Sequence, residues 1–328
     1  MGLARNALIA ASQSRWLREH AMRWRFVRHA SRRFLPGERY EDALAAAREL
    51  AAIGVSSMLS RLGENVTEAS EAEAVAEHYF TVLAGMRAAG LPPSLSVKPT
   101  QLGLDLDAAL CERNLERILN AGERAQQAAP LRPQNDLRGI IWIDMEQSAY
   151  VDRTLELYRH ARSRHASVGI CLQTYLRRTP ADLDSLLPLG PVIRLVKGAY
   201  HEPASIAYPA KRDVDEAFFA LVQKLLSAEA AAAGARAGIG THDPKLIERI
   251  VQLATSESAK GQGPDAIRSR IEFQMLYGIR RDLQRKLASE GWPVSVLISY
   301  GTHWFPWYMR RLAERPANVW FVLKNLFG

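Results

Sequence analysis

Short apolar segments recur along this chain of 328 residues, and most of them are separated by a stretch long enough for a helix. Eight segments can be delimited: Ile53–Leu59, Ser94–Lys98, Gly139–Met145, Ser167–Gln173, Val192–Lys197, Ala235–Thr241, Arg270–Gln274 and Pro293–Tyr300. Short apolar runs between turn-forming residues are typical of buried strands. Between them apolar residues recur at helical spacing, most clearly in Val214–Ala233, which is alanine-rich and closed by Gly234.

Eight strand–helix units predict an α/β fold, a (βα)8 barrel of the TIM type with parallel strands. Further helices are predicted at Asp105–Arg124 and Tyr150–Arg164, and a weaker one at Asp182–Leu187. Since no low-complexity linker divides the units, we expect residues 51–328 to form one barrel domain. Residues 1–50 would precede it as an N-terminal helical arm.

Composition excludes several classes of protein. An apolar fraction of 48% is typical of globular chains. The two cysteines, Cys111 and Cys171, form neither a metal-binding spacing nor a disulfide framework, so a reducing cytoplasm is the expected compartment. The chain has no run of about 18 or more uncharged apolar residues, so we expect no membrane-spanning helix.

The basic character of the chain is concentrated at its start. Eight arginines and one acid give residues 1–33 a net charge of +7, out of +8 for the whole chain. We therefore expect no nucleic-acid-binding surface on the barrel. Because aromatic residues such as Trp16 and Trp24 interleave with these arginines, the arm could lie on the inner face of an anionic membrane. It could equally pack on the barrel, and its arginine-rich character is also typical of a transit peptide.

Polar residues stand at the carboxyl ends of the predicted strands, where barrel enzymes have their active sites. They are Lys98, Asp144, Glu146, Gln173, Arg194, Lys197, Thr241, His242, Gln274 and Tyr277. The most consistent alternation puts Lys98, Asp144, Gln173 and Arg194 on inward positions. Taken singly, each is more often a solvated or structural residue, and the His-Asp-Pro at 242–244 could simply begin a helix. Together around one rim, they indicate a bound ligand.

A pair of adjacent arginines, Arg310 and Arg311, follows an aromatic run in "GTHWFPWYMRR". Two guanidinium groups suit a carboxylate, provided that their helix lies over the barrel mouth. The aromatic residues would then exclude water from the pocket. In the last strand, Val294, Val296 and Ile298 share one face, so Leu297 is expected to point into the barrel near its mouth.

Several motifs of other enzyme classes are absent from the sequence. It has no G-x-G-x-x-G after a strand, no P-loop, no H-E-x-x-H and no G-x-S-x-G elbow. A nicotinamide-binding Rossmann fold, an ATP-binding P-loop and a zinc hydrolase are therefore not expected, and no metal site is predicted. A lysine at a strand end, Lys98 or Lys197, leaves open a Schiff-base lyase of the aldolase kind.

From about Phe34 onward, the chain resembles the monofunctional bacterial proline dehydrogenases. The motifs that carry the resemblance are "SVKPTQLGLDLD", "WIDMEQSAYVDRTLELYR", "LQTYLRRTPADL", "RLVKGAYHEP", "GTHDP", "IEFQMLYGIRRDLQ" and "YGTHWFPWYMRRLAERPANV". The resemblance implies a distorted barrel with FAD at the carboxyl ends of the strands. It implies oxidation of L-proline to Δ1-pyrroline-5-carboxylate, with hydride transfer to flavin N5 and electrons passed to a membrane quinone. It also favours a mature helical arm over a transit peptide.

The resemblance also assigns roles to individual residues. It implies that Arg310 and Arg311 bind the substrate carboxylate, with Glu314 paired to them. It places Lys98 beside substrate and flavin, Asp144 as its charged neighbour and Arg194 near flavin N5. The cofactor would be held by Met145, Gln173, Lys197, Gly198, Ala199, Thr241 and His242.

One position departs from the family pattern. Where the family's last strand reads like "YVPYG", with a tyrosine that packs on the proline ring, this chain reads "LISYG" and has Leu297. Leucine keeps the apolar contact and leaves more room. Two interpretations remain open: a tolerated change in a proline enzyme, or a pocket for a modified or larger cyclic imino acid such as hydroxyproline.

Overall fold

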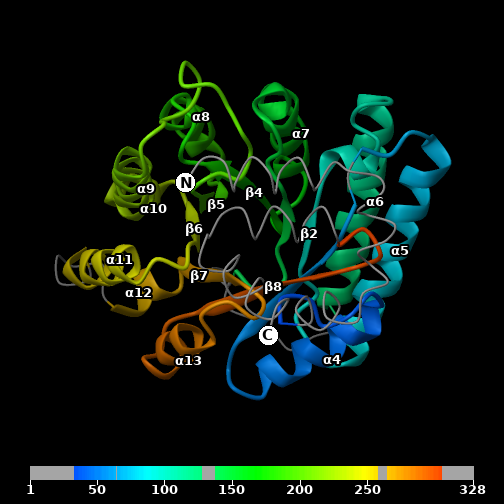
Figure 1. Cartoon of the computed structure of the whole chain (residues 1–328), viewed down its shortest axis with the longest axis horizontal. Coiled ribbons are helices and arrows are strands. Elements are labelled where there is room, and N and C mark those ends of the chain that lie inside the picture. Colours follow the sequence, from blue (N-terminus) through cyan, green and yellow to red (C-terminus); the bar gives the residue numbers. More distant parts are fainter. Residues whose placement is uncertain (1–32, 64, 128–136, 258–263, 305–328) are drawn as a thin grey trace, which may run out of the picture.

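The computed structural model describes residues 33–63, 65–127, 137–257 and 264–304. Eight parallel strands close into a barrel in chain order, which confirms the predicted (βα)8 fold (Figure 1). The strands are β1 Ser56–Arg61, β2 Leu95–Val97, β3 Ile141–Ile143, β4 Val168–Gln173, β5 Val192–Val196, β6 Arg236–Gly240, β7 Ile271–Leu276 and β8 Val294–Tyr300. Their shared direction puts all eight carboxyl ends at one mouth.

Helices surround the barrel (Figure 1). The α-helices are α4 Tyr40–Ala51, α5 Ala69–Ala88, α6 Ala108–Gln127, α7 Val151–Arg162, α8 Thr179–Leu186, α9 Lys211–Leu226, α10 Ala228–Ala232, α11 Pro244–Glu257, α12 Pro264–Arg268 and α13 Arg281–Ser289. Short 3-10 helices follow β2 at Pro99–Leu102 (η1), precede α7 at Ser148–Tyr150 (η2) and follow α8 at Leu187–Leu189 (η3). No helix in the described part of the chain is long and apolar enough to cross a membrane.

Only the last part of the predicted N-terminal arm lies within the described residues. Helix α4 packs against β1 and β8, while residues 1–32 lie outside the described residues. The predicted division at residue 50 stays a prediction. The predicted C-terminal helix over the mouth also lies outside the described residues.

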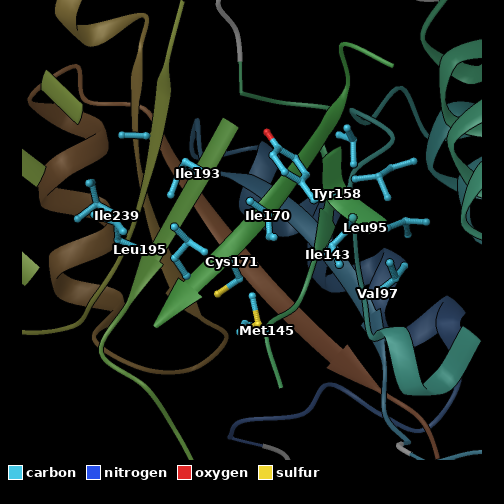
Figure 2. Close-up of a cluster of buried hydrophobic side chains, with 14 of the residues drawn as sticks. Leu95, Val97, Ile143, Met145, Tyr158, Ile170, Cys171, Ile193, Leu195 and Ile239 are labelled. Atoms are coloured by element: carbon cyan, nitrogen blue, oxygen red, sulfur yellow. The ribbon is translucent and has the colours of Figure 1, made fainter. Parts of the chain in front are cut away.

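Alternation along the strands separates two apolar regions. Outward side chains such as Ile193 and Leu195 are completely buried in the layer between strands and helices (Figure 2). A smaller cluster of Met58, Leu137, Ile140, Trp142 and Val192 forms a separate core, against which Leu297 packs. Val296 and Ile298 belong to the outer layer, so the predicted orientation of β8 is confirmed.

Strands β2 and β3 have only three residues each and are shorter than predicted. Strand β2 ends at Val97 because Pro99, which has no N–H, begins η1 directly after Lys98. Strand β3 spans only Ile141–Ile143, although the amide of Asp144 still donates to the carbonyl of Val97 at 2.8 Å.

The helix predicted at Val214–Ala233 is two helices. Ser227 adopts an extended conformation (φ −61°, ψ 160°) and ends α9. Its side chain then accepts a hydrogen bond from the amide of Ala230 and caps α10. A serine inside a helical pattern therefore marked a boundary that apolar spacing alone did not reveal.

Candidate active site

A cavity of about 660 Å³ opens at the carboxyl ends of the strands. Eight predicted site residues line it: Asp144, Arg194, Lys197, Gly198, Ala199, Thr241, His242 and Leu297. Its volume lies within the range of about 300–1,000 Å³ that small-molecule and cofactor sites occupy. Lys98, Met145 and Gln173 are not among the lining residues; Lys98 is ion-paired with the lining residue Asp144, whereas Met145 and Gln173 are hydrogen-bonded to each other.

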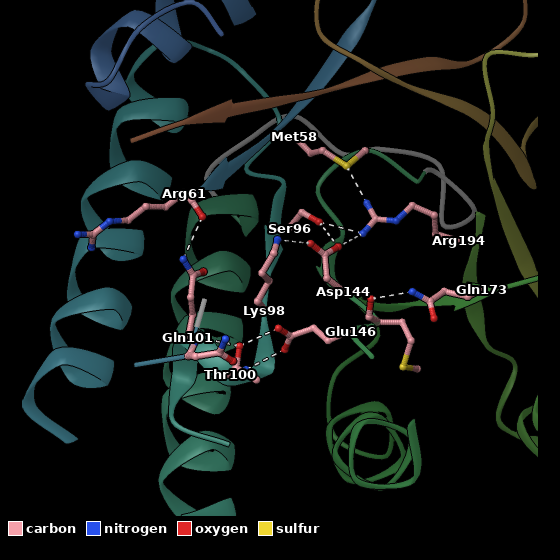
Figure 3. Close-up of polar contacts among 12 residues, drawn as sticks. Met58, Arg61, Ser96, Lys98, Thr100, Gln101, Asp144, Glu146, Gln173 and Arg194 are labelled. Carbon is pink, nitrogen blue, oxygen red and sulfur yellow. Dashed lines mark hydrogen bonds and ion pairs between the residues drawn. The ribbon is translucent and has the colours of Figure 1, made fainter. Parts of the chain in front are cut away.

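The inner end of the cavity holds a charged cluster, which we call the inner cluster: Lys98, Asp144 and Arg194, with Ser96 (Figure 3). Lys98 Nζ donates to Asp144 Oδ2 at 3.0 Å, and Arg194 forms an ion pair with Oδ1 of the same carboxylate. Ser96 Oγ donates to Oδ1 at 2.6 Å and accepts from Arg194 at 2.9 Å. One carboxylate therefore joins cations from β5 and from the end of β2.

This cluster is well shielded from water. The side chains of Arg194, Lys98 and Asp144 are 6%, 15% and 17% exposed. Burial alone would raise the pKa of Asp144, but attraction to Lys98 and Arg194 and the hydrogen bond from Ser96 outweigh it, so the pKa is lowered. Asp144 is consequently a carboxylate at neutral pH, and it is shared by two cations, Lys98 and Arg194.

Arg194 has two further contacts that sequence reasoning did not identify. Its guanidinium donates to Met58 Sδ at 3.2 Å and lies over the Trp142 ring at 5.1 Å from the centroid. Cation–π contact with a completely buried indole is strongest when water is absent. The inward alternation of β1 and β3 could have suggested these contacts, but only closure of the barrel brings the three side chains together.

The turn after Lys98 is fixed by a second carboxylate. Glu146, only 3% exposed, accepts hydrogen bonds from the amide and the hydroxyl of Thr100 at 3.0 and 2.7 Å. Nearby, Gln101 donates to the carbonyl of Arg61 at 3.1 Å (Figure 3). These bonds connect η1 to the ends of β3 and β1, so the turn that carries Lys98 is held rigidly.

Gln173 and Met145 meet beside the cavity. Gln173 Nε2 donates to the carbonyl of Met145 at 3.3 Å, while Gln173 Oε1 is buried without a hydrogen-bond partner among the described residues. Gln274, which lines the cavity, also has a buried Oε1 without a hydrogen-bond partner among the described residues. Buried amide oxygens without partners are costly, so two of them around one cavity indicate a missing donor.

Farther out, four charged side chains form what we call the outer cluster: Lys197, Lys211, Asp215 and Asp243. Lys197 Nζ lies 2.5 Å from Asp215 Oδ1 and 3.2 Å from Asp243 Oδ2. Lys211 forms ion pairs with the same two carboxylates, at 3.2 Å to Asp243 Oδ2. Burial raises the pKa of Asp243, but hydrogen bonds from Lys211 and Lys197 outweigh this and lower it to about 2.

Two glycines allow the backbone to pass close to other groups at the cavity wall. Gly198 has φ +116°, and a Cβ there would meet the Tyr175 ring at 2.2 Å. At Gly240 a Cβ would meet Val196 at 2.7 Å and the carbonyl of Leu195 at 2.8 Å. The predicted cofactor loop thus requires glycine at Gly198 for both conformation and space.

His242 has a defined orientation. Its Nε2 accepts a hydrogen bond from the amide of Leu276, the last residue of β7, at 2.8 Å. A ring nitrogen that accepts must be unprotonated, so the proton of the neutral ring is on Nδ1. Asp243 contacts the start of α11, because its Oδ1 accepts from the amide of Lys245 at 3.2 Å. The His-Asp-Pro segment at 242–244 can therefore begin a helix and also place His242 at the cavity wall.

Other predicted features fall outside the described residues or are not seen within them. Arg310, Arg311 and Glu314 lie outside the described residues, so their predicted roles stay predictions. Within the described ranges, no group of three or more His, Cys, Asp or Glu side chains could hold a metal ion.

Solved structures with the same fold are proline utilization A proteins. Proline utilization A (PutA) from Bdellovibrio bacteriovorus, inactivated by N-propargylglycine, superposes with a TM-score of 0.76 at 20% sequence identity, over 95% of this chain. PutA from Corynebacterium freiburgense gives a TM-score of 0.68 at 20% identity, over 98% of this chain. This chain spans only 36% and 34% of those proteins, and the likeness shows a shared fold.

Comparison of sequences identifies the family. Proline dehydrogenase 1 of Bacillus subtilis (strain 168) is 35% identical over 325 residues, which cover 99% of both chains. Proline dehydrogenase of Deinococcus radiodurans is 37% identical over 296 residues, 90% of this chain and 89% of that protein. The family model described as proline dehydrogenase matches residues 43–324. The chain therefore belongs to the proline dehydrogenase family.

Proposed function

We propose that this protein is an FAD-dependent proline dehydrogenase, which oxidises L-proline to Δ1-pyrroline-5-carboxylate. The observation that carries the proposal is the inner cluster: one buried carboxylate, Asp144, holds Lys98 and Arg194 at the inner end of the cavity. Two buried cations held by one carboxylate beside the cavity are suited to an anionic substrate and to negative charge that develops during reduction of a bound acceptor.

The residues around the cavity fit a flavin. Gln173 and Gln274 each offer a buried oxygen that lacks a donor among the described residues, and the single N–H of an oxidised isoalloxazine ring is a donor suited to one of them. Gly198 and Gly240 allow close approach of the backbone. In this proposal Lys197, Ala199, Thr241 and His242 hold the ribityl-diphosphate portion, and Met145 packs against the cofactor. Bound FAD would supply the hydride acceptor.

The protein's own residues supply positioning and charge. Arg310 and Arg311 are proposed to bind the proline carboxylate, which orients the ring carbon beside the nitrogen toward the acceptor. Lys98 and Arg194 cannot move apart while Asp144 holds both, so their charges stay directed at the reacting groups. Ser96, Met58 and Trp142 fix the guanidinium of Arg194 from its other sides. Pre-organised charge of this kind costs no rearrangement during the reaction.

Product formation tests the proposal directly. Purified protein with added FAD should convert L-proline, in the presence of a soluble quinone analogue, into a product that reacts with o-aminobenzaldehyde as pyrroline-5-carboxylate does. D-proline and omission of the quinone are the controls. Equal product without proline, or none under any condition, would contradict the proposal.

A second candidate substrate rests on Leu297, which lines the cavity where the family pattern has tyrosine. Its side chain gives apolar contact without a hydroxyl, so hydroxyproline or pipecolate could be accommodated. KM and kcat for proline, hydroxyproline and pipecolate, with wild type and Leu297→Tyr, distinguish the alternatives. A wild-type preference for hydroxyproline that Leu297→Tyr reverses would support the altered pocket. If proline is the best substrate of both proteins, the altered pocket is wrong.

The Schiff-base alternative is less consistent with the site. A lysine nucleophile must be a neutral amine, whereas Lys98 and Lys197 are both ion-paired with aspartates. Borohydride with a carbonyl substrate would trap a covalent adduct on a lyase and none on the proposed flavoenzyme.

The electron acceptor is proposed to be a membrane quinone, reached by peripheral contact of residues 1–33. Their net charge of +7 would favour an anionic membrane surface. Sedimentation with anionic liposomes should decrease when residues 1–33 are deleted, provided that the deletion variant keeps its flavin. Equal sedimentation of both proteins would rule out binding by the arm.

A further inference from the structure

The outer cluster lies where two hollows meet. Lys211 and Asp243 line both the main cavity and a second hollow of about 370 Å³. The second hollow lies by α9 and α11, two helices that pack together on the outside of the barrel (Figure 1). Lys211 is the first residue of α9, and Asp215 follows one turn later. Lys197, at the end of β5, reaches the same two carboxylates from inside the cavity.

This arrangement differs from an ordinary surface salt bridge. An isolated exposed pair involves one acid and one base and contributes little. Here two carboxylates, 20% and 22% exposed, each contact both ammonium groups. The lowered pKa of Asp243 keeps it charged at any physiological pH. Two lysines from different elements are therefore held close together at one edge of the main cavity.

The lysines retain capacity for a ligand. An ammonium group has three N–H donors, and the two carboxylates engage two of those on Lys211 within the described part of the chain. The side chain of Lys211 is 72% exposed, so its remaining donor is accessible from the cavity. Asp243 turns its other oxygen to the backbone of α11, away from the lysines.

We propose that Lys211 is a second cation for the diphosphate group of the flavin cofactor, acting beside Lys197. The two ammonium groups match the two negative charges of a diphosphate, while Asp215 and Asp243 hold those groups at a fixed spacing. This inference rests on the proposed flavin-dependent function. It adds a residue on α9 to a site otherwise formed by strand ends and their loops.

The test compares flavins that differ in charge. The full-length protein is stripped of flavin, and Kd is measured by fluorescence quenching for FAD and for uncharged riboflavin at low salt. Lys211→Met should raise the Kd for FAD about tenfold, as expected for loss of one charge-assisted hydrogen bond, and leave that for riboflavin unchanged. The control is Lys245→Met, because Lys245 lines only the second hollow.

The outcomes separate the role of Lys211 from the proposed flavin-dependent function. If wild type binds FAD and Lys211→Met binds it equally well, Lys211 is not a diphosphate ligand, although the flavin function stands. If Lys245→Met weakens FAD binding as much as Lys211→Met, the effect is general electrostatics and the proposal fails. If riboflavin binds too weakly to measure, the dependence of the FAD Kd on ionic strength is measured instead. This dependence should be weaker in Lys211→Met than in wild type, and unchanged in Lys245→Met. If wild type binds no FAD, the proposed function itself is wrong.

Discussion

The inner and outer clusters use the same kinds of side chain but differ in balance and burial. In the inner cluster one carboxylate is ion-paired with two cations, and the three side chains are at most 17% exposed. In the outer cluster two carboxylates serve two lysines, and Lys211 is 72% exposed. The inner cluster thus holds two cations on one carboxylate in a dry environment, whereas the outer one pairs two lysines with two carboxylates and is more open to water.

This difference indicates different roles. Charges buried this deeply are unfavourable without close partners or a ligand, and we propose that the inner cluster takes part in the chemistry. A balanced, partly exposed cluster can hold its lysines in place at little cost and exchange contacts with an incoming anion. Substitutions should therefore cause the largest losses in the inner cluster and progressively smaller ones outward.

The largest effect is expected for Asp144→Asn. This change removes the carboxylate that Lys98 and Arg194 share, and breaking a buried ion pair costs about 3–5 kcal/mol. We expect kcat/KM for proline to fall at least about a hundredfold, and the free energy of unfolding in urea to decrease. Steady-state kinetics and urea denaturation measure both quantities. An Asp144→Asn variant as active and stable as wild type would contradict the role of the inner cluster.

A smaller loss is expected for Gly198→Ala. The substitution places a Cβ against the Tyr175 ring at a position with φ +116°, so the loop must move. We expect a loss of about 1–3 kcal/mol and a reduced content of bound FAD, measured by absorbance after purification. Gly234→Ala is the matched control, because Gly234 also has a positive φ (+81°) but no atom lies within 4 Å of its Cβ. Equal FAD content in both variants would show that the contact with Tyr175 is unimportant.

Asp243→Asn tests the outer cluster through pH. The folded-state pKa of about 2 lies below the ordinary 3.8. Asp243 therefore contributes stability above pH 3.8, and the contribution is lost as pH falls toward 2. Allowing for solvent screening, we expect about 1–2 kcal/mol at pH 5. Urea unfolding at pH 5 and pH 3 should show a smaller difference between wild type and variant at pH 3. A difference that does not change with pH would exclude this linkage.

The smallest effect is expected for Asp152→Asn. Asp152 pairs with Arg178 on the surface, and its side chain is 81% exposed. Such pairs contribute about 0–1 kcal/mol. Urea denaturation should give a change of at most about 0.5 kcal/mol, which calibrates the larger losses. A loss comparable to that of Asp144→Asn would mean that burial is not what separates the two positions.

The barrel could be predicted from the sequence because the alternation of strands and helices is a local and periodic pattern. Alternation along β8 was enough to orient Leu297, and the rule that barrel sites lie at strand ends brought Asp144 and Arg194 to one mouth. The break at Ser227 was missed because one polar residue does not disturb the apolar spacing. Pro99, by contrast, could have predicted the early end of β2.

The contacts of the site were harder to predict than its location. Met58 and Trp142 contact Arg194 across the barrel interior, a relation that depends on the closure of eight strands. Asp215 was missed because it lies within an amphipathic helix, where a charge is usually solvated. Sequence patterns thus located the mouth, whereas partners that come from distant elements required the structure.

The most direct test of the central claim is an anaerobic titration of the purified, FAD-loaded protein with L-proline, followed by visible absorbance. We predict that the flavin band bleaches with proline, and that Asp144→Asn loaded with FAD bleaches at least about a hundredfold more slowly. A flavin band that persists at saturating proline in the wild type would contradict proline oxidation. Equal bleaching rates in both proteins would contradict the role of the inner cluster.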